Sequence, residues 1–429
     1  MKKTSHYSNT GWAFLLGVVL LTSCSNSEKK NQTLTAADSA AVGLSLPQGF
    51  SASVVADSLG ALRHLAVNKK GDIYVKLSKL QGGKGILFLT DTDGDGKMDK
   101  TVGFGNYPGT GIRIQGNQLY SSSNSSVYKY ALNDKGEVID TGKAELLVQG
   151  LVDKGRDNAK SFALDGQNNL YVAIGSYDET CTDPSGTGKK NCPLLDSVGG
   201  IWQFKTNKLK QSYSDGVHYS KGLKNVVGLD WNEATNSLFA APHGRGGLYG
   251  KFPKLYTEEQ DKALPAETLY ELDKGADAGW PYVYYDPFQQ KKIVSPEYGG
   301  DGKKSVEDKY VNPVADFPAH LAPNDLLFYT GDLFPAKYKN GAFIVFHGRS
   351  QTVNKGSLVA FVPFKNGKPS GPWEVFADNF MQADDSAAKT SYHHRPMGIA
   401  QGPDGALYVA DDLKGTIFKI SYSAKGKQD

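Results

Sequence analysis

The amino-acid sequence predicts an all-β fold, a six-bladed β-propeller closed by an N-terminal strand in the last blade. The first observation is a unit that recurs six times: an apolar strand, a turn of Gly, Asn or Asp, and a second strand with Tyr or Phe. The second is the presence of 49 glycines in 429 residues without a collagen-like period, which indicates many tight turns. The third is the 39% hydrophobic content, which excludes a disordered chain.

The N-terminal segment predicts an export signal that is removed before folding. Lys2 and Lys3 precede an apolar run, Trp12–Leu21, that is too short to span a bilayer stably. The run ends in Leu-Thr-Ser-Cys, which resembles a bacterial lipoprotein processing box, so residues 1–23 would be the signal peptide and Cys24 the lipidated residue. Residues 24–45 then form a flexible tether. The sequence therefore predicts an exported, membrane-anchored lipoprotein that faces the periplasm or the cell surface.

The six recurring units are predicted as antiparallel hairpins, because their strands alternate in polarity and turn residues separate them. They cover residues 64–75, 112–120, 162–175, 227–240, 326–346 and 398–410. Six such units in one chain favour a ring of four-stranded blades over a sandwich. Strand Phe50–Val55 lacks a hairpin partner, so we expect it to pair with Ile417–Ile420 and close the last blade.

One short helix interrupts the predicted strands, near Thr257–Leu264, and Pro265 ends it. No boundary is visible within the strand-rich region. The sequence therefore predicts a single propeller domain over residues 46–424, followed by a tail at 425–429.

Charge excludes nucleic acid as a partner. The chain has 48 basic and 45 acidic residues, a net charge of +3, and no long basic cluster.

Three cysteines predict one disulfide. If Cys24 carries lipid, Cys181 and Cys192 remain, and an even number of cysteines in an oxidising compartment favours a bond between them. The alternative is a pair of free thiols.

An acidic loop predicts a calcium site. Asp91, Asp93, Asp95 and Asp99 alternate with other residues, and a glycine stands at the sixth position, so their carboxylates and the Lys97 carbonyl could surround one ion. The loop follows a strand and has Val102 in place of the usual twelfth-position Glu, which favours a structural clip over a sensor. The alternative is an ordinary acidic turn.

From about Leu46 to Tyr422 the chain resembles the PQQ-dependent sugar dehydrogenases of the soluble glucose dehydrogenase and sorbosone dehydrogenase type. The segments that carry the resemblance are Leu62–Val67, Gly279–Tyr282, Tyr284–Asp286, Pro296–Gly302, Pro318–Pro323, His347–Gly348, Arg395–Gly398 and Pro403–Gly405. The resemblance implies a six-bladed propeller with PQQ and calcium over its central mouth. It also implies a small carbohydrate substrate, oxidised as an aldehyde or hemiacetal, and an electron acceptor such as a cytochrome or a quinone.

A polycarboxylate quinone requires cationic side chains, and Arg supplies two parallel donors. Cationic residues recur at the ends of the predicted blade strands. The residues that we expect to hold the cofactor are Arg63, His64, Lys160, Arg245, Trp280, Arg349, Lys355 and Arg395.

The predicted catalytic residues are Asp157, Lys224 and Asn225, and they depart from the family pattern. Asp157 occupies the position of the family's basic His, and Lys224-Asn225 replaces an Arg-Asn pair. Asp157 could act as a carboxylate base if its surroundings favour proton uptake.

Two other functions stay open on the sequence. One is a propeller that binds carbohydrate or has a structural role and has lost oxidation. The other is a propeller lactonase, whose metal ligands would include Glu297, Asn225 and Asp157.

Overall fold

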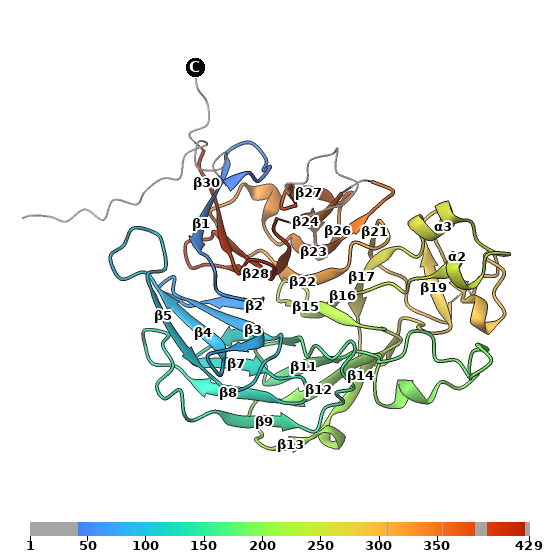
Figure 1. The fold of residues 1–429 in the computed structure, drawn as a ribbon, viewed down its shortest axis with the longest axis horizontal. Helices are drawn as coiled ribbons and strands as arrows, with labels where there is room; N and C mark the ends of the chain where they lie inside the picture. Colours follow the sequence, from blue (N-terminus) through green and yellow to red (C-terminus); the bar gives the residue numbers. More distant parts are fainter. Residues whose placement is uncertain (1–41, 307, 354, 382–392, 425–429) are drawn as a thin grey trace, which may run out of the picture. The chain divides into compact units, whose positions relative to one another are not determined.

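The computed structural model describes residues 42–306, 308–353, 355–381 and 393–424, all within one compact unit, Leu34–Asp429. Six sheets, each containing four antiparallel strands, surround a common centre (Figure 1). This is the six-bladed β-propeller that the sequence predicts. The predicted signal peptide, Cys24, most of the predicted tether and the predicted tail lie outside the described residues, so these predictions stay predictions.

The first three blades follow the chain in order. Blade 1 consists of β2 (Leu62–Val67), β3 (Ile73–Gln81), β4 (Lys84–Thr90) and β5 (Lys100–Phe104). Blade 2 consists of β6 (Ile112–Gln115), β7 (Gln118–Ser122), β8 (Val127–Ala131) and β9 (Glu145–Gln149), with β13 (Gln211–Ser212) at its edge. Blade 3 consists of β10 (Phe162–Leu164), β11 (Asn169–Ile174), β12 (Gly200–Lys205) and β14 (Val217–Lys221), with β18 (Ala276–Asp277) at its edge.

The last three blades complete the ring. Blade 4 consists of β15 (Val226–Asn232), β16 (Ser237–Pro242), β17 (Glu267–Leu272) and β21 (Ala315–Phe317). Blade 5 consists of β22 (Pro323–Phe328), β23 (Ala342–Ser350), β24 (Lys355–Val362) and β27 (Glu374–Ala377). Blade 6 consists of β28 (Pro396–Gln401), β29 (Leu407–Asp411), β30 (Ile417–Tyr422) and β1 (Phe50–Ala56). Two small ribbons pair β19 (Val283–Asp286) with β20 (Lys291–Val294), and β25 (Phe364–Lys365) with β26 (Lys368–Pro369).

Each predicted hairpin forms the first two strands of one blade. In blade 6, for example, Ile399 pairs with Val409 and Ala400 with Tyr408. The strands are buried on both faces because neighbouring blades pack against each other, which explains apolar runs such as that of β23.

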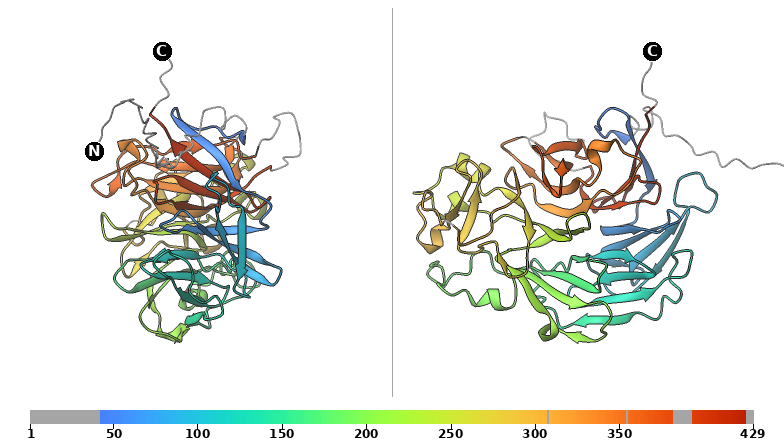
Figure 2. Two further views of the ribbon diagram at one scale, coloured as in Figure 1. Left: turned by 90° about the vertical axis from the view of Figure 1, so that its left-hand side faces the viewer. Right: turned by 180° about the vertical axis from the view of Figure 1, so that it is seen from behind.

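The N-terminal strand closes the ring as predicted. β1 pairs antiparallel with β30, from Phe50 opposite Tyr422 to Ala56 opposite Ile417 (Figure 2). The Phe50 ring makes edge-to-face contacts with Phe334, Tyr338 and Phe376. Such pairs each contribute roughly 0.5–1.5 kcal/mol beyond burial alone. The closing strand is therefore fixed by its aromatic anchor as well as by backbone hydrogen bonds.

Helices are few in the described residues. The predicted helix is α3 (Glu258–Ala263), which begins at a capping box formed by Thr257 and Gln260. Helix α2 (Leu248–Lys251), which the sequence pattern did not indicate, precedes it. Short 3₁₀ turns are η1 (Pro193–Asp196), η2 (Tyr213–Asp215), η3 (Pro296–Tyr298) and η4 (Ala336–Tyr338). In the described part of the chain, no helix has both the length and the apolar character needed to cross a membrane.

Two described residues ahead of the predicted domain start pack against the propeller. Leu44 is buried in the core beside Phe50, and Ser45 forms a β-bridge with Asp378. The end of the predicted tether therefore contacts blades 5 and 6.

Candidate functional site

The first strands of the blades begin at the same end of the ring, because every blade repeats the same strand order. Close contacts between the first strands of neighbouring blades support this common strand direction. A Cβ added to Gly398, in β28, would lie 2.6 Å from the Arg63 carbonyl oxygen in β2. One added to Gly111, before β6, would lie 2.9 Å from the Lys160 oxygen before β10. We call this end, where β2, β6, β10, β15, β22 and β28 begin, the N-terminal mouth.

The three predicted catalytic residues lie together at the N-terminal mouth. Lys224 Nζ is 2.9 Å from Asp157 Oδ2, and Asn225 Nδ2 donates to Asp157 Oδ1 at 3.3 Å. Asp157 has a φ of 46°, in the left-handed region, which Asp tolerates better than most residues. Gly175 packs directly against this cluster. A Cβ at this position would lie 2.4 Å from the Asp157 backbone carbonyl oxygen and 2.7 Å from Asn225 Oδ1. The cluster therefore requires glycine at position 175, because any larger side chain would displace Asp157 or Asn225.

A second carboxylate, Glu179, shares the same lysine. Its Oε2 lies 3.5 Å from Lys224 Nζ and also pairs with the Arg156 guanidinium. The Lys224 side chain is only 8% exposed, so these charges interact with little screening by water. Lys224 is thus held between two carboxylates. Neither Glu179 nor Arg156 could be recognised from the sequence, because both lie in irregular loops without a motif.

The predicted disulfide is confirmed and helps to place Glu179. Cys181 and Cys192 are bonded and buried. Tyr298 Oη donates to the Cys181 carbonyl at 3.0 Å, and Trp280 Nε1 donates to the Glu179 carbonyl at 2.9 Å. Trp280, predicted to contact the cofactor, is 7% exposed and packs against the disulfide, a placement that favours a structural role.

We expect the Cys181→Ser/Cys192→Ser double variant to be less stable by about 2–3 kcal/mol, because the disulfide restricts the unfolded chain. Equilibrium unfolding in urea measures this loss. Dithiothreitol should destabilise the wild type and leave the double variant unchanged. Equal stabilities of the two proteins without reductant would contradict the prediction.

The His243 ring contacts the Asn225 side-chain amide and fixes its orientation. Its Nδ1 lies 3.3 Å from Asn225 Nδ2, and its Nε2 lies 3.0 Å from the Pro323 carbonyl oxygen. Burial, with the nearby charge of Lys224, lowers the pKa of His243 to about 4. The ring is therefore neutral at pH 7, with Nε2–H donating to the carbonyl and Nδ1 accepting from the amide. This arrangement fixes the Asn225 amide with its N–H₂ toward Asp157 and His243.

Two predicted arginines occupy another part of the N-terminal mouth. Arg395 binds Asp412 through two parallel hydrogen bonds of 2.8 and 3.1 Å. Burial lowers the pKa of Arg63 to about 10, which still leaves its guanidinium charged at neutral pH. Its guanidinium donates to the Thr110 hydroxyl at 3.1 Å and to the Met397 sulfur at 3.4 Å, and the nearby carboxylates of Asp412 and Asp325 favour its charged form. Arg63 therefore offers a cationic group to this mouth.

His347 lies near these arginines, and its burial predicts a pH dependence of stability. Burial and the charges of Arg395 and Arg63 lower the pKa of His347 to about 3. An unfolded histidine titrates near pH 6.5, so between these two values the unfolded chain binds a proton that the folded chain does not. The free energy of unfolding should therefore fall as the pH is lowered from 7 to 5.

The His347→Gln variant should show a smaller loss between pH 7 and pH 5 than the wild type, measured by urea unfolding at each pH. His393→Gln is the matched control, since the His393 side chain is exposed, and it should keep the wild-type slope. If both variants keep that slope, His347 does not supply the pH dependence.

The predicted cofactor residue Arg245 is engaged in a buried ion pair. Its Nη1 and Nη2 lie 2.6 and 3.0 Å from Glu297 Oε2 and Oε1, and the two side chains are 4% and 3% exposed. Both carboxylate oxygens of Glu297 are therefore engaged by the Arg245 guanidinium, which competes with the metal binding that a lactonase would require of this residue.

Lys160 and His64 are buried with backbone partners. Lys160 Nζ donates to the Asn158 carbonyl at 2.7 Å, and burial lowers its pKa to about 8. His64 Nε2 lies 2.8 Å from the Asn324 carbonyl, and burial lowers its pKa.

Lys355 is exposed and pairs with Asp378, while Arg349 is half-buried on β23 opposite Gly356. This pairing directs Lys355 to Asp378 and not to the predicted catalytic residues.

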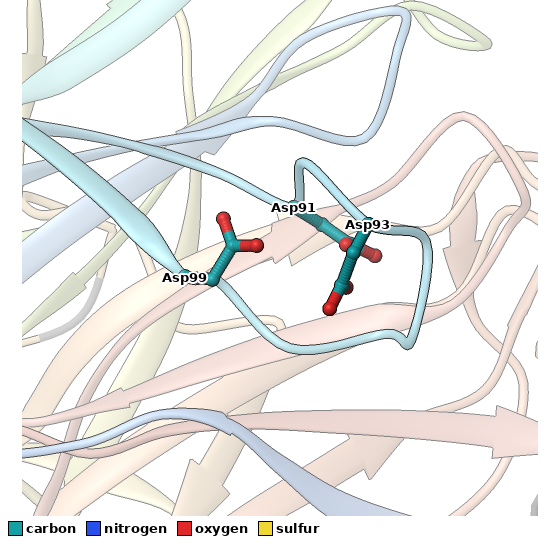
Figure 3. A group of neighbouring side chains, drawn as sticks. All are labelled: Asp91, Asp93 and Asp99. Carbon is teal, nitrogen blue, oxygen red and sulfur yellow. The ribbon is translucent and has the colours of Figure 1, made fainter.

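The acidic loop between β4 and β5 gathers three of its four predicted carboxylates. One oxygen each from Asp91, Asp93 and Asp99 lie within 4.8 Å of one another (Figure 3). Asp95 is not part of this group, and its Oδ1 accepts from the Lys97 backbone N–H at 2.7 Å.

Comparison with known proteins identifies the family. A family model described as TrAA12-like matches residues 44–423. The chain belongs to the TrAA12-like family. A pyrroloquinoline quinone-dependent sugar dehydrogenase from Hypocrea jecorina is 22% identical to this TrAA12-like chain over 405 residues, covering 88% of the chain and 89% of that protein.

Solved structures share the fold of this TrAA12-like protein. The calcium structure of a Trichoderma reesei family AA12 protein matches with a TM-score of 0.71 and 20% identity, covering 89% of this chain and 97% of that one. The holo form of a pyranose dehydrogenase PQQ domain from Coprinopsis cinerea matches with a TM-score of 0.69 and 17% identity, covering 88% and 97%.

Proposed function

We propose that this TrAA12-like protein is a PQQ-dependent dehydrogenase that oxidises the hemiacetal or aldehyde of a small carbohydrate. The observation that carries the proposal is the Asp157 carboxylate, held between Lys224 and Asn225 at the N-terminal mouth. The activity of the Hypocrea jecorina relative and the cofactor of the Coprinopsis cinerea structure support it.

The residues at this mouth fit an anionic quinone. At this mouth, three of the buried polar atoms that lack a hydrogen-bond partner among the described residues are Asn225 Oδ1, Arg245 Nε and His347 Nδ1. Unpaired buried polar atoms are costly, so a ligand that meets them is favoured. The charged Arg63 guanidinium suits a carboxylate of the cofactor. Arg63 would therefore hold a carboxylate of PQQ, the Arg245 Nε–H would donate to one of its oxygens, and Asn225 Oδ1 would accept from an N–H or O–H group.

When bound, PQQ would supply the acceptor for the hydride from the sugar C–H bond. Asp157 would take the proton of the hydroxyl on the same carbon. Lys224 holds Asp157 Oδ2 at 2.9 Å, and the Asn225 contact to Oδ1 is longer, at 3.3 Å, so Oδ1 is the better proton acceptor. Glu179 keeps Lys224 in place from the other side. A cyclic hemiacetal would leave as its lactone.

Reconstitution tests this proposal. Purified protein is loaded with PQQ and calcium, and reduction of an artificial dye is followed with a panel of aldoses and osones, with lactone hydrolysis assayed separately. Turnover with a sugar supports the dehydrogenase. Failure to bind PQQ rejects it, lactone hydrolysis without dye reduction indicates a lactonase, and sugar binding without either reaction indicates an inactive binding propeller.

We also propose that the acidic loop binds calcium. Carboxylate oxygens are the donors that calcium prefers, and three of them face one another here. EDTA should lower the midpoint of thermal unfolding, because bound calcium stabilises the folded state. Asp93→Asn should reduce the EDTA effect, and Asp140→Asn, an exposed residue outside the carboxylate group, should not. An unchanged midpoint after chelation would argue against a bound ion.

We further propose export and lipid anchoring through Cys24, and electron transfer to a cytochrome or quinone. The signal-like residues 1–23 and the cysteine that follows them support anchoring. Expression of Cys24→Ala should move the protein from the membrane to the soluble fraction, and an unchanged distribution would reject anchoring through this residue.

A further inference from the structure

A cavity of about 560 Å³ lies at the end of the ring opposite the N-terminal mouth. Its walls include the last residues of the first strands of several blades, among them Gln115 of β6, Leu164 of β10 and Asn232 of β15. Its volume falls in the range of small-molecule sites, roughly 300–1,000 Å³. None of the residues assigned above to catalysis, PQQ or calcium lines it. We call it the C-terminal cavity.

Arg113 lines the C-terminal cavity and joins blades 2, 4 and 5 through hydrogen bonds. Its Nη2 donates to Asp325 Oδ1 at 3.2 Å and to the carbonyls of Leu229 and Leu326 at 3.1 and 3.3 Å. Its Nε is buried and has no partner among the described residues. Arg113 is therefore fixed in place through Nη2, and its Nε–H is a buried donor without an acceptor among the described residues.

A second unsatisfied donor comes from Asn232. This residue is 2% exposed, and its Oδ1 accepts from the Ala234 backbone N–H at 3.0 Å. Its Nδ2 is buried and has no hydrogen-bond partner among the described residues. A buried amide N–H₂ without an acceptor is costly, so this atom favours a ligand that supplies an oxygen.

The same cavity also presents acceptors. Asp230 Oδ2 accepts from the Phe328 backbone N–H at 2.9 Å, and Glu233 stands exposed at the rim. An anionic ligand would satisfy the donors of Arg113 and Asn232 but would be repelled by these carboxylates. Hydroxyl groups satisfy both kinds of partner, because each can donate and accept.

Trp231 adds a rigid apolar wall. It is half-buried, lines the cavity, and stacks on Tyr171 with ring centroids 5.2 Å apart and planes 15° apart. An aromatic ring held in this way provides an apolar surface beside polar groups, as the C–H face of a sugar requires.

We infer that the C-terminal cavity is a second carbohydrate-binding site, separate from the N-terminal mouth, for a neutral mono- or disaccharide unit. Trp231 stacks on the sugar ring, Asn232 and Arg113 donate to its oxygens, and Asp230 accepts from a hydroxyl. The site anchors carbohydrate to the protein at a distance from the proposed chemistry, and it does not depend on that chemistry.

Calorimetric titration of the full chain without PQQ tests this inference. The probes are glucose, galactose, mannose, xylose, cellobiose and xylobiose, with malonate as the anionic probe. We expect at least one neutral sugar to bind more tightly than malonate. Asn232→Asp keeps the oxygen that accepts from Ala234 and removes the donor, so it should weaken sugar binding by about tenfold or more.

Two further variants locate the site. Glu233→Ala, which removes the acceptor at the exposed rim, should weaken binding even if Asn232→Asp fails to fold, and Lys224→Met, at the N-terminal mouth, should leave the sugar affinity within twofold. Circular dichroism checks the fold of each variant. Absence of binding by every sugar, tighter binding of malonate, or loss of binding in Lys224→Met alone would overturn the inference.

Discussion

Asp157→Asn should lower kcat for dye reduction by about 10²- to 10⁴-fold in the PQQ-loaded enzyme, because the variant lacks the carboxylate that takes the substrate proton. The substitution is nearly isosteric, and Asn, like Asp, tolerates the left-handed backbone conformation at this position. The affinity for PQQ should change little, since the variant keeps an oxygen for the Asn225 amide. A stopped-flow or steady-state dye assay measures kcat, and fluorescence titration measures PQQ binding.

The matched control is Asp140→Asn, the same change on an exposed loop, which should keep the wild-type kcat. If Asp157→Asn retains more than half of the activity, another group is the base. A parallel loss of PQQ affinity would indicate that Asp157 organises the mouth instead of accepting the proton.

Glu297→Gln should reduce the free energy of unfolding by about 3–5 kcal/mol, because it leaves the buried guanidinium of Arg245 without a compensating charge. Both side chains are almost fully buried, so water cannot replace the lost carboxylate. Replacing both residues, as Arg245→Leu/Glu297→Leu, should cost less than the single change, since no unpaired charge remains. Urea unfolding measures all three proteins.

Glu374→Gln serves as the control for this pair. Glu374 is 2.8 Å from Lys337 Nζ, but the two side chains are 46% and 56% exposed, so its loss should cost less than about 1 kcal/mol. Similar losses of unfolding free energy for Glu297→Gln and Glu374→Gln would show that burial does not decide how much the Arg245–Glu297 pair contributes to stability.

The sequence predicted the features whose signals are local. Each hairpin could be recognised from alternating polar and apolar residues and from a turn such as Pro403–Gly405. The pairing of β1 with β30 followed because the N-terminal strand had no hairpin partner of its own. The disulfide followed from the number of cysteines. The placement of Asp157 beside Lys224 and Asn225 followed from the family resemblance, which aligns loops that are distant along the chain.

The partners of individual charges could not be predicted. Arg245 pairs with a glutamate 52 residues away, and Lys224 meets Glu179, which precedes the disulfide-bonded Cys181 in an irregular segment. Such pairs leave no periodic pattern, since they join irregular segments that only the closed ring brings together. For the same reason the C-terminal cavity, built from the ends of several strands, has no motif of its own.

The pairing of β1 with β30 also sets the order in which the molecule can be completed. Residues 50 and 422 are partners, so the final blade cannot form until almost the whole chain has been made. Contacts between such distant positions make folding slow, and an unpaired strand edge is prone to aggregation meanwhile. A chain truncated before residue 417 would lack β30, so β1 would keep an unpaired edge permanently.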